Sequence, residues 1–259
     1  LPIYFVNNAT MYSSEYEREK YVNDYIIANC VYDDEAAYNN NTKGNVSNAY
    51  GVLVDGKAIC EGYARAFQLL CNKLGIACVS IAGMTGDVGH EWNCAKIDGN
   101  WYQVDVTWND SEDEFSNYYY FNLTDEQMYS SHRADDLFDE IEPDNYNNDE
   151  NLIGNLYVPE CNSTEYNYYN QTAPILYAFD EENDNTISNA LANSAVNGDN
   201  YFNIIVDDSL DFEDAYSTLV QDGYVVNYIE SANNMLWGEV ELDTSSYAYK
   251  NDTLRVITI

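Results

Sequence analysis

A cysteine at the predicted start of a helix is the residue of this chain best placed to act as a nucleophile. The stretch from Asp55 to Gly75 opens with a glycine-containing turn and ends with a glycine placed to stop the helix. At Cys60, the first helical residue, unpaired N–H groups and the positive end of the helix dipole would stabilise a thiolate. The alternative role is that of a small buried hydrophobic residue, which is commoner for cysteine. Helical spacing places five residues on one face, which we expect to be buried: Cys60, Ala64, Phe67, Cys71 and Leu74.

A β-hairpin downstream of this helix carries a histidine and an aspartate. The sequence predicts two strands, His90–Ile97 and Trp101–Trp108, with Asp98-Gly99 between them. An Asp-Gly pair between two such runs is a strong signal for a tight antiparallel turn. The preceding segment, Ile76–Met84, is short and β-branched, so we expect a neighbouring strand there.

The register of this hairpin predicts which side chains meet. A two-residue turn that pairs Ile97 with Asn100 would place Trp92 opposite Asp105. His90 and Asp105 would then be diagonal neighbours on one face, within reach of each other. A three-residue turn would place them on opposite faces instead, so this inference depends on the turn. A carboxylate beside an imidazole orients the ring and stabilises its protonated form.

These three residues suggest acyl-transfer chemistry if the hairpin packs against the helix that Cys60 begins. The His90 imidazole would accept the thiol proton, the thiolate would attack a carbonyl, and His90 would protonate the departing amine. Asp105 would orient the imidazole, and the backbone N–H of Cys60 would be one donor to the oxyanion.

Four segments resemble the bacterial transglutaminase-like superfamily in the correct order. They contain a Cys in a Cys-x-Gly-Tyr-Ala context, a His before an aromatic residue and Asn, and an Asp before Thr-Trp. The resemblance covers Tyr16 to His132, and Val31-Tyr32-Asp33 and the stretch from Phe121 to His132 are similar to segments that flank the core. The matching segments are Gly51–Ala64, Leu74–Ile76, His90–Asn93 and Gly99–Trp108.

This resemblance implies a papain-like α+β fold with the cysteine on a helix and the other two residues on the adjacent sheet. It implies Cys60, His90 and Asp105 as the catalytic triad. Glu91 departs from the pattern, because the family has a small residue there, and we expect it to point to solvent from the other face of the strand. We expect His132 to be structural or exposed. Candidates for a substrate pocket are Tyr63, Trp92 and Trp108.

The composition excludes several partners. Acidic residues outnumber Lys and Arg by 45 to 10, for a net charge of −35. This charge argues against nucleic acid and anionic membranes, and no apolar run is long enough to span a bilayer. Six cysteines without a C-x-x-C spacing, and only two histidines, argue against structural zinc, and we expect no cofactor or metal. The chain starts with Leu1 and not with Met, so we expect a missing signal or anchor and a secreted or cell-surface protein.

The chain divides into two predicted domains. Residues 1–168 form the catalytic domain, with an acidic, linker-like region at about 134–155. In this domain we also expect a helix from about Ser14 to Asn29, which Ser13 or Ser14 can cap together with Glu17, and a strand at Tyr118–Phe121. Residues 169–259 form a small accessory α/β or α+β domain. In this second domain we expect helices at 183–195 and 210–220. We expect strands at 174–179, 201–206, 224–229, 236–242 and 253–259.

Two functions remain open at this point. The first is a thiol enzyme, either a peptidase or amidase or a transglutaminase, that acts on a protein or peptide substrate, with the second domain binding substrate or the cell surface. The second is a non-catalytic surface-binding module that keeps the fold. Cys60, His90 and Asp105 are all present, which favours the enzyme.

Overall fold

The computed structural model describes residues 5, 8–9, 11–39, 43–135, 158–238, 240–243 and 248–259. The chain folds as two compact units, residues 1–166 and 167–259. Most of the predicted acidic linker-like region lies outside the described residues. Within the described parts of the chain, no helix has the length and apolar character needed to cross a membrane.

The first long helix, α2 (Glu15–Asn29), begins with a capping box. The Ser14 hydroxyl accepts the backbone N–H of Glu17, and the Glu17 carboxylate accepts the backbone N–H of Ser14. This exchange satisfies two N–H groups at the helix start, as the Ser-x-x-Glu pattern of residues 14–17 predicts. Buried Val22 and Ile26 face the interior, where α2 contacts α4 (Cys60–Lys73).

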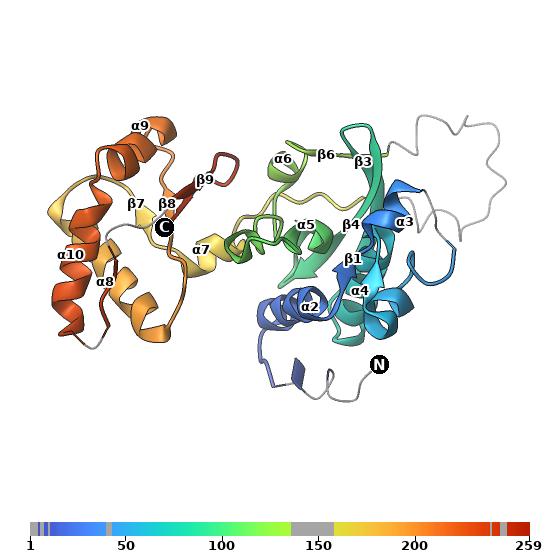
Figure 1. The fold of residues 1–259 in the computed structure, drawn as a ribbon. Coiled ribbons are helices and arrows are strands. Elements are labelled where there is room, and N and C mark those ends of the chain that lie inside the picture. The colour runs from blue at the N-terminus through green and yellow to red at the C-terminus, as the bar shows by residue number, and fades with distance from the viewer. Residues whose placement is uncertain are drawn as a thin grey trace. The chain divides into compact units, whose positions relative to one another are not determined.

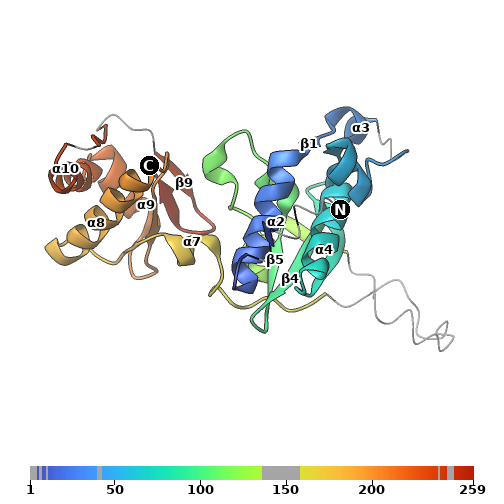
Figure 2. The same ribbon diagram turned by 90° about the horizontal axis from the view of Figure 1, so that it is seen from below.

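A pair of short parallel strands leads the chain into α4. Strand β1 (Val31–Tyr32) pairs with β2 (Lys57–Ala58), so that Tyr32 lies opposite Ala58, two residues before Cys60. Between them lie α3 (Asp34–Tyr38) and a π-helical turn, η1 (Gly51–Asp55). Helix α4 then begins at Cys60 as predicted and packs on the sheet (Figures 1 and 2).

The sheet of the first unit has the strand order β5-β4-β3-β6 and is antiparallel throughout. Asp98 and Gly99 both have positive φ angles, 46° and 96°, and Ile97 pairs with Asn100, which confirms the predicted two-residue turn. Buried Asn93 donates a hydrogen bond of 3.0 Å to the Ala64 carbonyl and so ties the sheet to α4. The strands are β3 (Cys78–Thr85), β4 (Val88–Ile97), β5 (Asn100–Val104) and β6 (His132–Ala134).

The predicted second strand of the hairpin is too long. Pairing ends at Asn93 opposite Val104, and the chain then turns into α5 (Val106–Asn109). The Asp105 carboxylate accepts the backbone N–H groups of Thr107 and Trp108, and this N-cap interaction stabilises the turn over a continued strand. Trp92 therefore does not lie opposite Asp105 in the ladder.

The predicted strand at Tyr118–Phe121 is also wrong, because these residues form turns. Within the described parts of the chain, a single β-bridge, between Gln103 and Leu123, joins the following segment to β5. The edge position beside β3 belongs instead to β6, where Thr85 pairs with His132. Short helical turns η2 (Glu114–Ser116) and α6 (Asp125–Met128) precede it.

The second unit has a mixed sheet of order β7-β8-β10-β9, in which β7 and β8 are parallel. The predicted strand at 224–229 is wrong: these residues begin α10, and the predicted strand at 236–242 starts within the end of that helix. Tyr228, Ile229, Ala232 and Leu236 recur at helical spacing and are buried in the core of this unit, which overrides the strand preference of Val and Ile. The elements are α7 (Tyr168–Thr172), β7 (Ile175–Leu176), α8 (Glu181–Asn197), β8 (Asn203–Val206), α9 (Phe212–Tyr216), η5 (Ser217–Gln221), α10 (Val225–Leu236), β9 (Tyr249–Asn251) and β10 (Val256–Thr258).

Candidate active site

Cys60 is the first residue of α4, and its thiol is free and buried, with 8% of the residue exposed. Ile59 provides no side-chain cap, and the Gly62 backbone N–H donates instead to the Ile59 carbonyl at 2.8 Å. Gly62 is required in this turn because a Cβ atom would lie 2.6 Å from the Val46 carbonyl oxygen. The close approach of these two segments therefore fixes the helix start and the position of the thiol.

Tyr32 contributes a hydroxyl group near this helix start. Burial and the negative charge of a Cys60 thiolate raise the pKa of Tyr32 to about 12, although a hydrogen bond from the Cys60 backbone N–H opposes this rise. The phenol therefore stays protonated and lies beside the N–H group expected to stabilise an oxyanion. The sequence analysis matched Val31-Tyr32-Asp33 to a segment that flanks the family core, but it predicted no role for Tyr32.

His90 lies on β4 and joins the thiol to Asp105. Its Nε2 atom is 2.6 Å from Asp105 Oδ2, and both side chains are almost fully buried. Burial by itself lowers the pKa of His90, but the Asp105 carboxylate and the hydrogen-bonded Cys60 thiol outweigh burial and raise the pKa to about 10. The imidazole therefore favours its protonated form when a thiolate is present.

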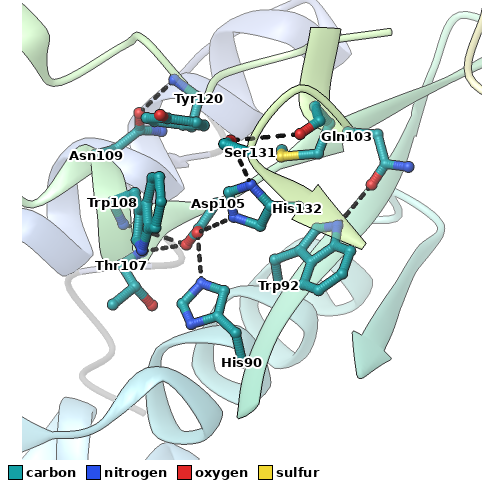
Figure 3. Close-up of polar contacts among 11 residues, drawn as sticks. His90, Trp92, Gln103, Asp105, Thr107, Trp108, Asn109, Tyr120, Ser131 and His132 are labelled. Carbon is teal, nitrogen blue, oxygen red and sulfur yellow. Dashed lines mark hydrogen bonds and ion pairs between the residues drawn. The ribbon is translucent and has the colours of Figure 1, made fainter. Parts of the chain in front are cut away.

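Asp105 is held by four N–H donors. Its Oδ1 atom accepts the backbone N–H groups of Thr107 at 2.9 Å and Trp108 at 3.2 Å, while Oδ2 faces His90 and His132 (Figure 3). Burial raises the pKa of Asp105, but the charges and N–H groups of the two histidines outweigh it and lower the pKa to about 2. The structure thus brings His90 and Asp105 together as predicted, through a helix cap and not through cross-strand register.

His132 is the residue of this cluster that the sequence prediction missed. It is 3% exposed, so of the two expected positions, structural or exposed, only the exposed one is wrong, and its Nε2 atom lies 3.0 Å from Asp105 Oδ2. The signal was present in the sequence, because the chain has only two histidines and the stretch that ends at His132 matched the family pattern. The sequence prediction gave His132 no catalytic role because Cys60, His90 and Asp105 already made a complete triad.

The three aromatic pocket candidates occupy different environments. Tyr63 and Trp92 are fully buried: the Tyr63 hydroxyl donates to Asp110, and the Trp92 indole N–H donates to Gln103 at 2.7 Å. Trp108 keeps 36% of its surface exposed. Of the three, Trp108 therefore has the side chain that an incoming substrate could touch, and its role in binding stays a prediction.

Glu91 turns away from the triad. Its carboxylate accepts a hydrogen bond from the Ser80 hydroxyl and forms an ion pair of 3.5 Å with Arg65. Its side chain is 12% exposed, so Glu91 lies in a polar contact at the edge of the fold and does not simply face solvent. The carboxylate thus has partners of its own and is not part of the Asp105 cluster.

One group of side chains among the described residues could also hold a metal ion. The His90 and His132 ring nitrogens and an Asp105 oxygen all lie within 4.8 Å of one another, and all three residues are buried. Two imidazoles and a carboxylate are common ligands of zinc and iron.

An α+β fold with a cysteine at a helix start, beside a histidine and an aspartate held by the sheet and its cap, defines the papain-like class. Residues 5–106 match the family model described as the Transglutaminase-like superfamily. This part of the chain is therefore similar to the transglutaminase-like superfamily. The matched range includes Cys60, His90 and Asp105 but ends before His132.

Curated relatives and a solved structure are similar to parts of this chain. Kyphoscoliosis peptidase of Mus musculus is 27% identical over 146 residues, which cover 52% of this chain and 22% of that protein. Kyphoscoliosis peptidase of Homo sapiens is 30% identical over 69 residues, 22% of this chain and 10% of that protein. The chain thus matches less than a quarter of the length of either relative. A solved structure of a TGase is 25% identical, covering 38% of this chain and 28% of that chain with a TM-score of 0.35.

Proposed function

We propose that the first unit is a thiol-dependent acyl-transfer enzyme that acts on amide or peptide bonds. Cys60 is the nucleophile, His90 the general acid and base, and Asp105 the residue that orients His90. The observation that carries this proposal is the position of His90, whose Nε2 atom lies 2.6 Å from Asp105 Oδ2 and whose pKa is raised by Asp105 and by the neighbouring Cys60 thiol. Nucleophile, base and orienting group in this order are the signature of an activated thiol.

Each group has a defined task in the reaction. His90 takes the thiol proton, and the Cys60 sulfur attacks the substrate carbonyl to give a tetrahedral oxyanion near the Cys60 backbone N–H. The C–N bond then breaks as His90 returns its proton to the leaving amine, which leaves a thioester on Cys60. Water or a second amine attacks the thioester with His90 as base, and the thiol is restored.

A protein or peptide is the proposed substrate. The relatives of highest sequence similarity reported above are named peptidases, and the same thioester would serve hydrolysis or transfer to an amine. We further propose an extracellular location, with the second unit as an accessory domain for the substrate or the cell surface. The net charge of −35 would favour basic peptides over acidic ones by simple attraction.

The burial of the site gives the second candidate function its support. Cys60 and His90 retain 8% and 9% exposure, which leaves little open surface for a large substrate. A closed site of this kind would also suit a non-catalytic binding module that keeps the fold. A small acyl donor distinguishes the two, because it needs far less space than a protein chain.

The test is acylation of the purified protein by p-nitrophenyl acetate. We expect a burst of nitrophenolate and an acetyl group that peptide mass spectrometry places on Cys60. Cys60→Ala should abolish the burst, and His90→Ala should slow it by at least about a hundredfold, the usual contribution of a general base. Cys30→Ala removes a second buried thiol and should leave the burst intact. Acetylation of other cysteines at the same rate, or a normal burst in His90→Ala, would contradict the enzyme proposal.

A further inference from the structure

We propose that His132 is a positioning residue of the active site, which holds Asp105 by a second imidazole N–H and so fixes His90 toward Cys60. This inference rests on the proposed function and adds a fourth residue to the triad. His132 comes from β6, the edge strand that pairs with β3. The site is therefore incomplete without a segment that follows the helix, the hairpin and α5.

The hydrogen positions in the cluster follow from Asp105. An ionised carboxylate only accepts hydrogen bonds, so both histidines must carry their proton on Nε2, at 2.6 Å for His90 and 3.0 Å for His132. His132 then accepts at Nδ1 from the Ser131 hydroxyl, 2.8 Å away. Both ring nitrogens of His132 therefore have a hydrogen-bond partner.

Aromatic side chains fix the His132 ring in this orientation. Its side chain is 0% exposed, and its ring centre lies 4.7 Å from that of Trp108 and 5.1 Å from that of Trp92. Tyr120 packs against it at 5.6 Å. Trp92 and Trp108 also contact the His90 ring, so the same two tryptophans pack against both imidazoles (Figure 3).

The second imidazole changes what Asp105 does for His90. With four N–H donors the carboxylate has no freedom to rotate, so Oδ2 stays on the His90 Nε2–H and the Nδ1 atom stays free for the thiol. The negative charge of Oδ2 is also divided between two donors. Without His132 that charge would act on His90 alone, and one buried carboxylate lone pair would lose its partner.

The distances favour hydrogen bonds over a metal centre. Tetrahedral zinc with bonds of about 2.0–2.1 Å separates its ligand atoms by about 3.3 Å, because the bond length and the angle fix that spacing. The His90 and Asp105 atoms are only 2.6 Å apart, the length of a charge-assisted hydrogen bond. A metal would also have to displace the protons on which the acyl-transfer reaction depends.

The test compares two substitutions of nearly equal shape, His132→Gln and His132→Met. The glutamine amide can donate to Asp105 in place of Nε2, whereas methionine cannot donate. We expect His132→Met to slow acylation of Cys60 by p-nitrophenyl acetate by about ten- to a hundredfold, the equivalent of one hydrogen bond to a charged group. His132→Gln should recover most of this loss. Thermal unfolding of both proteins checks that they fold equally well.

Proton NMR provides a readout that needs no acyl donor. In the wild-type protein we expect two strongly downfield imidazole N–H protons, one from each histidine bonded to Asp105. In His132→Met the remaining His90 proton should move further downfield because the carboxylate charge is no longer shared, and in His132→Gln it should stay near its wild-type position. Equal acylation rates for the two variants, or an unmoved His90 signal in His132→Met, would overturn the inference. Stoichiometric binding of added Zn²⁺ by the wild type, lost in both variants, would also overturn it. Failure of the enzyme proposal gives a different result, because wild-type Cys60 would then not be acylated at all.

Discussion

Glu19 offers a quantitative test of how burial in the first unit affects stability. It lies in α2 with 0% exposure, and its Oε2 atom accepts a 2.8 Å hydrogen bond from the side chain of Asn122, while Oε1 has no hydrogen-bond partner among the residues that the structure describes. Burial raises the pKa of Glu19 from 4.5 to about 8, even though the Asn122 hydrogen bond opposes it. The folded protein therefore keeps a proton that the unfolded chain releases.

The sign and size of the effect follow from this difference in proton binding. Between pH 4.5 and about 8, unfolding releases a proton, so stability falls as pH rises. At pH 7 the difference is about 2.5 pH units, or about 3 kcal/mol at 1.36 kcal/mol per unit. Glu19→Gln keeps the shape and an acceptor for Asn122 but cannot ionise. We expect the variant to exceed the wild type by about 3 kcal/mol at pH 7 and to match it near pH 4.

The assay is urea unfolding followed by tryptophan fluorescence at several pH values. A Trp237→Phe background removes the tryptophan of the second unit, so that Trp92, Trp101 and Trp108 report on the first. Glu17→Gln on the same helix provides a control of opposite sign. The Ser14 N–H and hydroxyl lower the pKa of Glu17, so this variant should lose stability at neutral pH and not at acidic pH. A stability difference for Glu19→Gln that does not change with pH would refute the reasoning.

Two further predictions concern the parts that hold the triad. Asp105→Asn removes the charge that raises the pKa of His90 and should slow Cys60 acylation by p-nitrophenyl acetate about a thousandfold or more, as in other triads in which the carboxylate is neutralised. A rate within a factor of a few of wild type would argue against Asp105 as the orienting residue. Gly83→Ala places a Cβ atom 2.2 Å from the Arg133 carbonyl oxygen and 2.6 Å from the Trp92 ring. It should destabilise the protein by about 1–3 kcal/mol in urea unfolding, with loss of the second downfield imidazole proton as β6 shifts, and unchanged stability would contradict the tight packing seen there.

The sequence predicted the parts of the site that depend on local signals. Ser14, Glu17 and the Asp98-Gly99 turn have strong sequence signatures, so α2 and the hairpin register followed directly. The start of α4 at Cys60 followed from helical spacing and the flanking glycines. These elements bring the proposed nucleophile, Cys60, and the proposed base, His90, into the same unit.

What the sequence did not predict depends on tertiary contacts. Asp105 is compatible with a strand, and only its capping of α5 and its contacts with two histidines turn the chain there. His132 reaches the site because β6 pairs with β3, a contact across nearly fifty residues that no local pattern encodes. In the second unit, the β-branched start of α10 favoured a strand, but packing against α8 selects a helix.

The four N–H groups around Asp105 bear on where the functional module ends. The family match stops at residue 106, but Thr107, Trp108 and His132 all lie beyond that point. A fragment cut at the edge of the match would contain the thiol, the imidazole and the carboxylate, yet it would lack three of the four donors that hold the carboxylate. The smallest excisable unit that keeps the proposed active site therefore extends at least through β6, and similar modules should be delimited by the donors to the aspartate as well as by the proposed triad.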